Sequence, residues 1–353
     1  MTQDCDIRVL FILKRKQDYY GTEIQIGLST GLYNSAVYID LMLKSENIIS
    51  KIVVVEDNNS IDKEVFDFKP THVIIEALWV VPEKFKILSK LHPTVKWIVR
   101  LHSQIPFISL EGVAMKWIFE YIENPNITIG TNSPEMLNEI RFISKINMNW
   151  TKNEEHKKIV YLPNYYPNVN KVKKFEYDKD YIDVSCFGAI RPLKNQLIQA
   201  VSAIKFAERI GKNLNFHING DRIEQKGDSI LRNLIDLFDN LPNHNLVLHE
   251  WLVKDEFLEL CSKMDIGLQC SFSETFNIVG SDIISQGVPL VGSAEIIWLD
   301  VLSIANPTKS DDIAKKLYEA YRMPEIIVRR SQYSLNKYAH KSKHIWIDYF
   351  KND

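Results

Sequence analysis

Apolar and polar positions along the chain follow two alternating periods. Short runs rich in β-branched residues, such as 7–13 (IRVLFIL), are typical of strands, and they alternate with amphipathic stretches such as 82–92 (PEKFKILSKLH). In the first half the pattern predicts strands at 7–13, 51–57, 72–78, 95–103 and 127–133, and helices at 34–45, 61–68, 82–92, 114–124 and 133–146. Strands that alternate with helices predict a parallel, doubly wound α/β sheet.

The alternation stops at 163–181 (PNYYPNVNKVKKFEYDKDY), where prolines, asparagines and charges without periodicity indicate a linker. It then restarts. Strands are predicted at 184–190, 215–220, 245–251, 265–271 and 288–293, with helices at 195–211, 229–241, 254–264 and between the last two strands. The sequence therefore predicts two α/β domains, 1–168 and 169–335. Ligands would bind in a cleft outside the carboxyl ends of the strands.

Composition and charge narrow the function classes. The 353 residues carry a formal net charge of −2, so contact with nucleic acid would depend on local basic patches. The four cysteines form no CxxC pair and predict reduced thiols. No apolar run has the length of a membrane span, and MTQDCDIRVL does not resemble a signal peptide, which predicts a soluble cytoplasmic protein.

Several catalytic motifs are absent from the sequence. No GxGxxG follows the first strand, and no GxxxxGK[ST], HExxH or GxSxG occurs, which argues against dinucleotide, P-loop, zinc-protease and serine-hydrolase chemistry. The DxD Asp178-Lys179-Asp180 falls in the linker and is interpreted as solvated. We therefore expect no catalytic metal.

The turn 187–195 (FGAIRPLKN), after the first strand of the second domain, is a candidate phosphate site. Gly188 would let the backbone approach a ligand closely. Arg191 and Lys194 would place two cations at the carboxyl edge of the sheet, where a diphosphate could bind. The alternative is a solvated turn with incidental basic residues.

Two acids, Glu274 and Asp282, stand eight positions apart in a segment that otherwise resembles a buried helix. Eight helical residues span about 12 Å, comparable to the distance from ribose to sugar in a nucleotide-sugar. If Glu274 immediately precedes the helix, the amides of Phe276, Asn277 and Ile278 would be available for diphosphate. Ligand hydroxyls would then be the partners that these buried carboxylates require.

On these residues the chain resembles a known family. The segment ETFNIVGSD with the following QGVPLV is similar to the E-x7-E element of retaining glycosyltransferases of the large family 4, which have the GT-B fold. The FGAIRPLKN turn resembles the donor-phosphate loop of that family. The chain departs from the family pattern at Asp282, which replaces a glutamate, and at Thr275 and Asn277, where glycines are common. Arg191 and Lys194 are also closer together than in many relatives.

The resemblance implies two Rossmann-like domains facing a central cleft, with a C-terminal helix, 336–353, that crosses back onto the first domain through Trp346, Tyr349 and Phe350. It also implies roles for the site residues. Glu274 would contact the transferred sugar, Asp282 the ribose, and Arg191 with Lys194 the diphosphate of a nucleotide-sugar, expected to be UDP-linked. This family requires no metal.

Fewer residues of the first domain are candidates. His102 lies at the carboxyl end of the strand that begins at 95, and similar enzymes, including phage DNA glucosyltransferases, carry a histidine there that contacts the donor sugar. The alternative is a surface histidine at a strand end. Gly21 and Gly31, in the loop after the first strand, and Glu111 are candidates for the acceptor side.

Three functions remain open at this point: a retaining glycosyltransferase, a nucleotide-sugar epimerase on the same fold, and a nucleotide-sugar binding module without catalysis. The residue usage also resembles phage-encoded glycosyltransferases, so the acceptor could be 5-hydroxymethylcytosine in DNA, or else a surface glycan or lipid-linked saccharide. DNA would require a basic rim around the cleft. Candidate basic clusters are Lys14-Arg15-Lys16, Lys171 with Lys173-Lys174, and Lys341 with Lys343.

Overall fold

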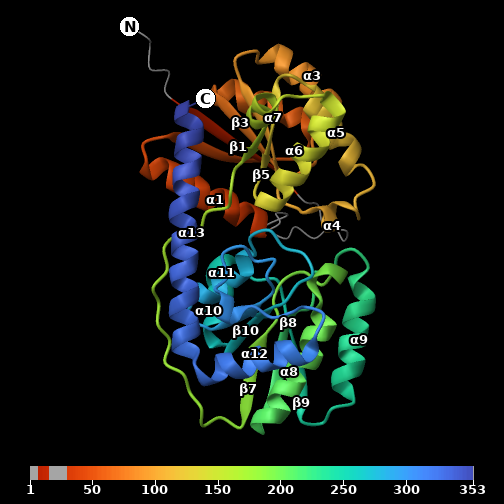
Figure 1. Cartoon of the computed structure of the whole chain (residues 1–353), viewed down its shortest axis with the longest axis vertical. Helices are drawn as coiled ribbons and strands as arrows, with labels where there is room; N and C mark the ends of the chain where they lie inside the picture. Colours follow the sequence, from red (N-terminus) through yellow and green to blue (C-terminus); the bar gives the residue numbers. More distant parts are fainter. Residues whose placement is uncertain (1–6, 16–29, 353) are drawn as a thin grey trace. The chain divides into compact units, whose positions relative to one another are not determined.

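The computed structural model describes residues 7–15 and 30–352 of the chain (Figure 1). Contacts between Cα atoms divide the chain into two compact units. Unit 1 contains Met1–Pro167 and Ala339–Asp353, and unit 2 contains Asn168–Tyr338. Each unit is built on its own parallel sheet, as the alternating sequence pattern predicts.

Unit 1 contains a six-stranded sheet in the order β2-β1-β3-β4-β5-β6, and every strand pair is parallel. The strands are β1 (Arg8–Lys14), β2 (Ile49–Val55), β3 (His72–Glu76), β4 (Lys96–Leu101), β5 (Ile127–Thr131) and β6 (Ile159–Tyr161). The carboxyl ends of β3, β4 and β5 therefore lie at one edge of the sheet. The sequence pattern missed β6, because three residues are too few to show a period.

The connections of unit 1 are mainly helical. They are α1 (Thr30–Ser45), α2 (Ile61–Phe68), α3 (Pro82–Leu91), α4 (Ile105–Ile108), α5 (Ala114–Glu123), α6 (Pro134–Met148) and α7 (Lys152–Lys158), with a short 3-10 helix at Asn58–Ser60. Ser133 caps α6 by accepting a hydrogen bond from the Met136 amide at 3.3 Å, and Pro134 opens the helix, as predicted. The predicted start of α1 at residue 34 is wrong: the helix begins at Thr30, and Ser35 is buried inside it.

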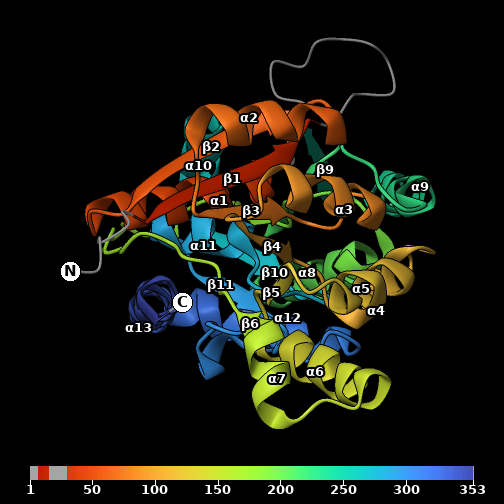
Figure 2. The same ribbon diagram turned by 90° about the horizontal axis from the view of Figure 1, so that it is seen from above.

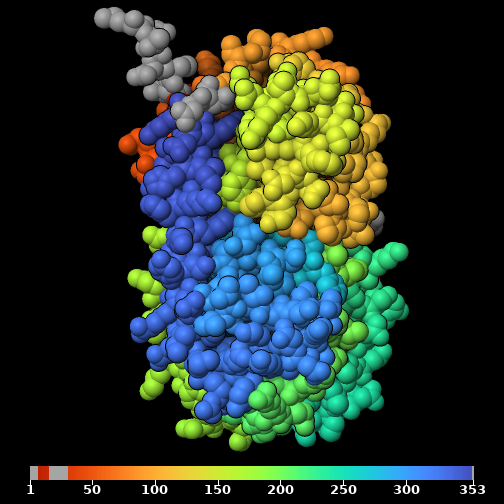
Figure 3. All heavy atoms as spheres, viewed as in Figure 1, coloured from red at the N-terminus to blue at the C-terminus, as the bar shows by residue number. Residues whose placement is uncertain are grey.

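The sheet of unit 1 is covered on both faces. One face packs against α2, α3, α5 and α6, and the other packs against α1 and the end of α13 (Pro324–Asn352). Figure 2 shows α3 and α5 on one side of the strands and α13 on the other. In the space-filling view, α6 and α7 form part of the visible surface of unit 1 (Figure 3). This arrangement is a doubly wound α/β layer structure.

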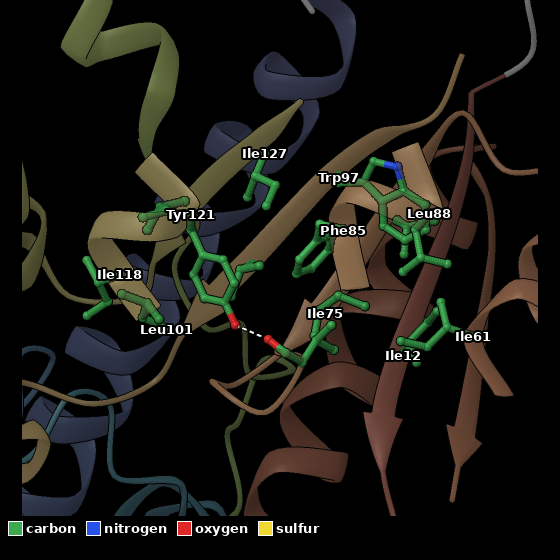
Figure 4. Close-up of a cluster of buried hydrophobic side chains, with 14 of the residues drawn as sticks. Ile12, Ile61, Ile75, Phe85, Leu88, Trp97, Leu101, Ile118, Tyr121 and Ile127 are labelled. Atoms are coloured by element: carbon green, nitrogen blue, oxygen red, sulfur yellow. Dashed lines mark hydrogen bonds between the residues drawn. The ribbon is translucent and has the colours of Figure 1, made fainter. Parts of the chain in front are cut away.

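Aromatic side chains fill the larger core of unit 1. The ring of Phe85 lies edge-on to Trp97, with centroids 5.8 Å apart, and edge-on to Tyr121, with centroids 5.6 Å apart (Figure 4). The Tyr121 hydroxyl donates a hydrogen bond to the main-chain oxygen of Val80. A buried tyrosine requires such a partner for its hydroxyl, and burial raises the pKa of Tyr121.

The C-terminal residues of α13 belong to unit 1. Trp346 is fully buried and donates a hydrogen bond from Nε1 to the Pro163 carbonyl oxygen at 2.8 Å, while its ring lies 6.2 Å from that of Phe11. Phe350 joins the same apolar cluster, and Tyr349 packs against it. The prediction that the last helix returns to the first domain is confirmed, and the helix begins earlier than predicted, at Pro324.

Unit 2 contains a five-stranded parallel sheet in the order β11-β10-β7-β8-β9. The strands are β7 (Tyr181–Ser185), β8 (Asn213–Asn219), β9 (His244–His249), β10 (Ile266–Gln269) and β11 (Leu290–Gly292). The helices are α8 (Gln196–Ile210), α9 (Gly227–Asp239), α10 (Lys254–Lys263), α11 (Ile278–Ser285) and α12 (Ser310–Arg322), with 3-10 helices at Pro192–Lys194 and Val301–Ser303. Helices α8, α9 and α12 pack on one face, and Ile283 of α11 approaches Gly267 on the other.

The segment 162–180 has no helix or strand, as predicted for a linker. Part of it is nevertheless buried, including Tyr166 and Val169. The side chain of Asn336 accepts from the amide of Val169 and donates to its carbonyl oxygen, both at 2.9 Å. This linker is therefore anchored rather than solvated over its first half.

Among the described residues, no helix is both long and apolar enough to cross a membrane.

Candidate active site

The order of the strands in unit 2 reverses between β7 and β10, because the chain continues from β7 to β8 on one side and later returns to place β10 on the other. Ligands of doubly wound sheets bind outside the carboxyl ends of the strands at such a point. Here the loops after β7 and β10 are joined directly. The Phe272 amide donates to the Leu193 carbonyl at 2.9 Å, and Asn195 Nδ2 donates to the Cys270 carbonyl at 3.0 Å.

The predicted phosphate turn has the backbone that a ligand-binding turn requires. Gly188 has a φ of 117°, which strongly favours glycine, and its amide donates to Asn219 Oδ1 at 2.8 Å. The Ile190 amide donates to the Arg222 carbonyl at 2.9 Å, so the turn is held by the loop after β8. The first residue of α9, Gly227, also lies close to the turn: a Cβ atom on Gly227 would be 2.1 Å from the Ile190 carbonyl oxygen. The turn is therefore fixed without a ligand.

Arg191 belongs to a small charged group formed by the loops after β7, β8 and β9. Its Nη1 lies 3.2 Å from Glu224 Oε2, and Arg222 contacts the other oxygen of Glu224 at 2.7 Å through Nη2. The Arg222 guanidinium in turn lies 4.5 Å from the ring centre of Trp251. The sequence had predicted Arg191 at this edge, whereas Arg222, Glu224 and Trp251 were not predicted.

Lys194 contacts Glu274, so the structure brings the predicted cation and the predicted acid together. Lys194 Nζ forms an ion pair with Glu274 Oε1, and both side chains are nearly buried. Asn277 Nδ2 donates to the same carboxylate oxygen at 3.1 Å. Lys194 lies in the loop after β7, whereas Glu274 and Asn277 lie in the loop after β10. The two loops are neighbours because β7 and β10 are adjacent in the sheet.

Asp282 is also paired. It lies within α11, with its side chain 4% exposed, and its Oδ1 contacts Nζ of Lys254, the first residue of α10. The prediction that ligand hydroxyls supply the missing partners of both acids is therefore wrong as a complete account: each acid has a lysine partner in this unit. Lys254 was missed because it is remote in sequence from Asp282.

The predicted helical spacing between the two acids also needs correction. Helix α11 begins at Ile278, and Glu274 lies four residues earlier in a non-helical turn, so a helical rise does not measure its distance from Asp282. Phe276 is buried against Trp298, whose Nε1 donates to the Phe276 carbonyl at 2.6 Å. The side chain of Phe276 therefore packs in the core, while the roles of the 276–278 amides remain predictions.

In unit 1, His102 joins a buried polar cluster at the carboxyl edge of the sheet. Its Nε2 contacts Glu76 Oε2, the last residue of β3. Arg100 Nη1 contacts the same carboxylate at 3.1 Å. The remaining donors of Arg100 contact the Leu162 carbonyl at 2.9 Å and Asn164 Oδ1 at 2.5 Å. Glu76 and Arg100 are fully buried, so their ion pair lies inside the protein at this edge of the sheet.

Burial and neighbouring charges shift the pKa values of Glu76 and His102 in this cluster. Burial alone would raise the pKa of Glu76, but the charges of Arg100 and His102 outweigh burial and lower it. Burial, and then the Arg100 charge, lowers the pKa of His102 against the opposing effect of Glu76. The other ring nitrogen of His102, Nδ1, lies 3.5 Å from Asn132 Nδ2.

The structure describes two of the three candidate acceptor residues. Gly31 lies in the first turn of α1, Glu111 lies in an exposed turn between α4 and α5, and Gly21 falls outside the described residues. Asp178 and Asp180 of the DxD are exposed. Within residues 7–15 and 30–352, no group of three or more His, Cys, Asp or Glu side chains is arranged to hold a metal ion. The acceptor roles stay predictions.

Comparisons with known proteins place the fold. No protein-family profile and no curated protein sequence matches the chain. Similar solved structures include HepE (Alr3699) of Anabaena in complex with UDP and glucose, at 10% identity over 98% of this chain and 100% of that one, with a TM-score of 0.65. The N-terminal domain of the Candida albicans trehalose-6-phosphate phosphatase matches at 11% identity, covering 98% and 96% of the two chains, with a TM-score of 0.68.

A trehalose-6-phosphate synthase, studied for glycosyl transfer with retention, matches at 10% identity over 84% of this chain and 77% of that one, with a TM-score of 0.59. At such low identity these likenesses establish architecture alone. They extend over both units of the chain, each with its own parallel sheet. The chain has the GT-B fold.

Proposed function

We propose that this chain is a glycosyltransferase that moves a sugar, a hexose or a pentose, from a UDP-sugar to a hydroxyl acceptor with retention of configuration. The observation that carries the proposal is the Lys194–Glu274 contact at the strand-order reversal of unit 2, with Gly188 and Arg191 in the adjoining turn. Supporting it, HepE, a protein of the same fold, binds UDP and glucose.

In the proposed reaction, Arg191 and Lys194 bind the diphosphate, Asp282 the ribose, and Glu274 the hydroxyls of the sugar. The bond between the anomeric carbon and the diphosphate oxygen breaks with its electron pair going to the diphosphate. The acceptor oxygen then bonds to the same face of that carbon, and the acceptor proton passes to the departing diphosphate. Arg191 and Lys194 already have carboxylate partners, so the diphosphate must compete with Glu224 and Glu274 for them.

His102 is proposed to contact the donor sugar from unit 1. Nε2 of His102 contacts Glu76 and Nδ1 lies 3.5 Å from Asn132 Nδ2, so a sugar hydroxyl that hydrogen-bonds to the ring must compete with these contacts. The buried pair of Glu76 and Arg100 fixes the ring, so these two residues position His102 rather than touch the substrate.

We propose two acceptor classes, 5-hydroxymethylcytosine in phage DNA and a saccharide of a surface glycan or lipid-linked chain. The candidate basic clusters bear on the choice. Arg15 pairs with Glu56, Lys343 pairs with Glu46, and Lys173 Nζ donates to the Met264 carbonyl at 2.5 Å, while Lys16 falls outside the described residues. The two ion pairs lower the net positive charge that the clusters at Arg15 and Lys343 offer to phosphates, which favours the saccharide.

The test offers a panel of UDP-hexoses and UDP-pentoses and measures UDP release, with and without EDTA. We expect slow UDP release from at least one donor, and no effect of EDTA because no catalytic metal is proposed. Recovery of an isomer of the donor sugar without transfer would identify an epimerase instead. Binding of UDP without any turnover of any donor would identify a binding module.

The acceptor experiment supplies hydroxymethylcytosine DNA, unmodified DNA and an oligosaccharide mixture together with the labelled donor. Label in the modified DNA alone would assign the DNA acceptor. Label in saccharide with none in either DNA would reject DNA and assign the saccharide class.

Removing either cation of the phosphate turn should weaken nucleotide binding. For Arg191→Ala and Lys194→Ala we expect a loss of about 1.5–3 kcal/mol each in UDP affinity, roughly 10- to 150-fold in Kd, because a charge-assisted contact to phosphate is lost. Isothermal titration calorimetry measures this loss. Lys205→Ala is the matched control, since Lys205 pairs with Asp311 on the exposed side of α8. An unchanged Kd in both variants would remove the turn from the donor site.

A further inference from the structure

Asn277 occupies a backbone conformation that usually belongs to glycine. Its φ is 57° and its ψ is 79°, in the left-handed region, and it immediately precedes α11. Among residues with a side chain, asparagine is one of the few that adopts this region at low cost. Asn277 therefore has a backbone conformation typical of glycine, and its side chain places a carboxamide beside Glu274.

The orientation of this carboxamide is determined by its contacts. Asn277 Oδ1 accepts from the Gly280 amide at 2.7 Å, which can only donate, so the NH2 group must point the other way. There Nδ2 donates to Gln269 Oε1 at 3.0 Å and to Glu274 Oε1 at 3.1 Å. Gln269 is itself held, because its Nε2 donates to the Phe187 carbonyl at 2.9 Å. The donor that Asn277 offers to Glu274 is thus fixed by buried neighbours.

Two donors therefore meet at one oxygen of Glu274. Lys194 Nζ and Asn277 Nδ2 both contact Oε1, and they come from opposite loops of the site. With Oε1 held from two directions, rotation of the carboxylate is restricted. Oε2 then has a defined direction and is the oxygen available to a ligand.

We propose that Asn277 is a positioning residue for Glu274: its side chain holds Oε1 so that Oε2 is presented to a hydroxyl of the transferred sugar. This inference rests on the proposed glycosyltransferase function and deepens it. It assigns to the side chain of Asn277 a task distinct from helix capping and from any contact of its amide with diphosphate. A glycine at this position would provide the backbone without the restraint.

Two variants separate positioning from capping. Asn277→Asp keeps an oxygen that accepts from the Gly280 amide but replaces the NH2 donor with a carboxylate that repels Glu274. Asn277→Gly keeps the backbone conformation and removes both contacts. We expect both to lower kcat by about 10- to 100-fold, the effect of displacing a catalytic contact by a fraction of its length. For Asn277→Gly the Kd for UDP should change less than about threefold, because the backbone amide of residue 277 and the phosphate turn are both kept.

Thr151→Ala is the control for lost capping. Thr151 accepts from the Glu154 amide at the start of α7 in unit 1, so this variant should lower Tm without changing kcat. A double-mutant cycle with Glu274→Gln tests the route of action. If Asn277 acts through Glu274, Asn277→Asp adds little to the loss caused by Glu274→Gln alone. Full additivity, or unchanged kcat in both Asn277 variants, would overturn the proposal.

A spectroscopic readout keeps this inference apart from the proposed function. The side-chain NH2 resonances of Asn277 in 15N-labelled protein are assigned by their loss in Asn277→Asp. They should shift in Glu274→Gln. They should stay unchanged in the control Glu259→Gln, since Glu259 is an exposed residue of α10 that pairs with Lys263. That shift with no turnover of any donor would reject the glycosyltransferase while keeping the contact. No shift, in a protein that does turn over a UDP-sugar, would reject the positioning role alone.

Discussion

Glu274→Gln is expected to lower the turnover of the UDP-sugar donor by about 100-fold, the effect of removing one charged contact that acts on the reacting sugar. The amide retains the shape of the side chain, so the fold of the 271–277 turn should persist. UDP affinity should be retained or improved, because Lys194 loses the carboxylate that competes with the diphosphate for it. Steady-state kinetics of UDP release and calorimetry with UDP measure the two effects separately.

Glu259→Gln is the matched control for this prediction. Glu259 lies on α10 of the same unit, is exposed and pairs with Lys263, so its change should leave turnover as it is. Equal turnover in Glu274→Gln and in the parent protein would mean that the acid is structural. Glu274 would then have no role in the proposed reaction.

Arg100→Met should destabilise the protein by about 3–5 kcal/mol, because it leaves the fully buried Glu76 without its cation. Four donated hydrogen bonds, two to Glu76, one to the Leu162 carbonyl and one to Asn164, disappear together. The guanidinium also lies 5.3 Å from the ring centre of Trp346, so packing of α13 on unit 1 is affected. Urea unfolding followed by circular dichroism measures the change.

Arg330→Met provides the exposed counterpart, since Arg330 is half exposed and pairs with Asp300 at 3.0 Å. Its cost should stay below about 1 kcal/mol, the usual limit for a surface pair. The double variant Glu76→Gln with Arg100→Met should recover part of the loss, because no buried charge remains unpaired. A cost of Arg100→Met equal to that of Arg330→Met would show that the buried pair is not what stabilises this edge.

Much of the fold could be predicted because the relevant signals are local. The run 7–13 is apolar and β-branched, and the structure forms β1 at Arg8–Lys14. The signals of α6, a serine followed by proline and an acid, lie within three residues and gave its start correctly. Helix α7 and strand β6 were missed because each is too short to display a period, and their pairing with α6 and β5 comes from tertiary packing.

The candidate site was predictable in part for the same reason. The turn with Gly188 and Lys194 and the acid Glu274 follow strands in the pattern, and parallel strands deliver their carboxyl ends to one edge. Glu76 and Arg100 could have been found, since each is a charge within an otherwise apolar strand, HVIIE and KWIVRL, and a buried charge requires a partner. Lys254 gave no such signal, because a lysine at the start of a helix is ordinary on a protein surface.

The alternation of strands and helices, the linker and the residue types at the edge of the second sheet could be predicted from local pattern, because periodicity and turn chemistry depend on residues a few positions apart. The partners of the charged side chains could not be predicted in this way. Lys194 and Glu274 are eighty positions apart, Lys254 and Asp282 twenty-eight, and Glu76 and Arg100 twenty-four. Their contacts arise from the order of strands in each sheet, which places distant segments side by side, and that order is a property of packing rather than of local pattern.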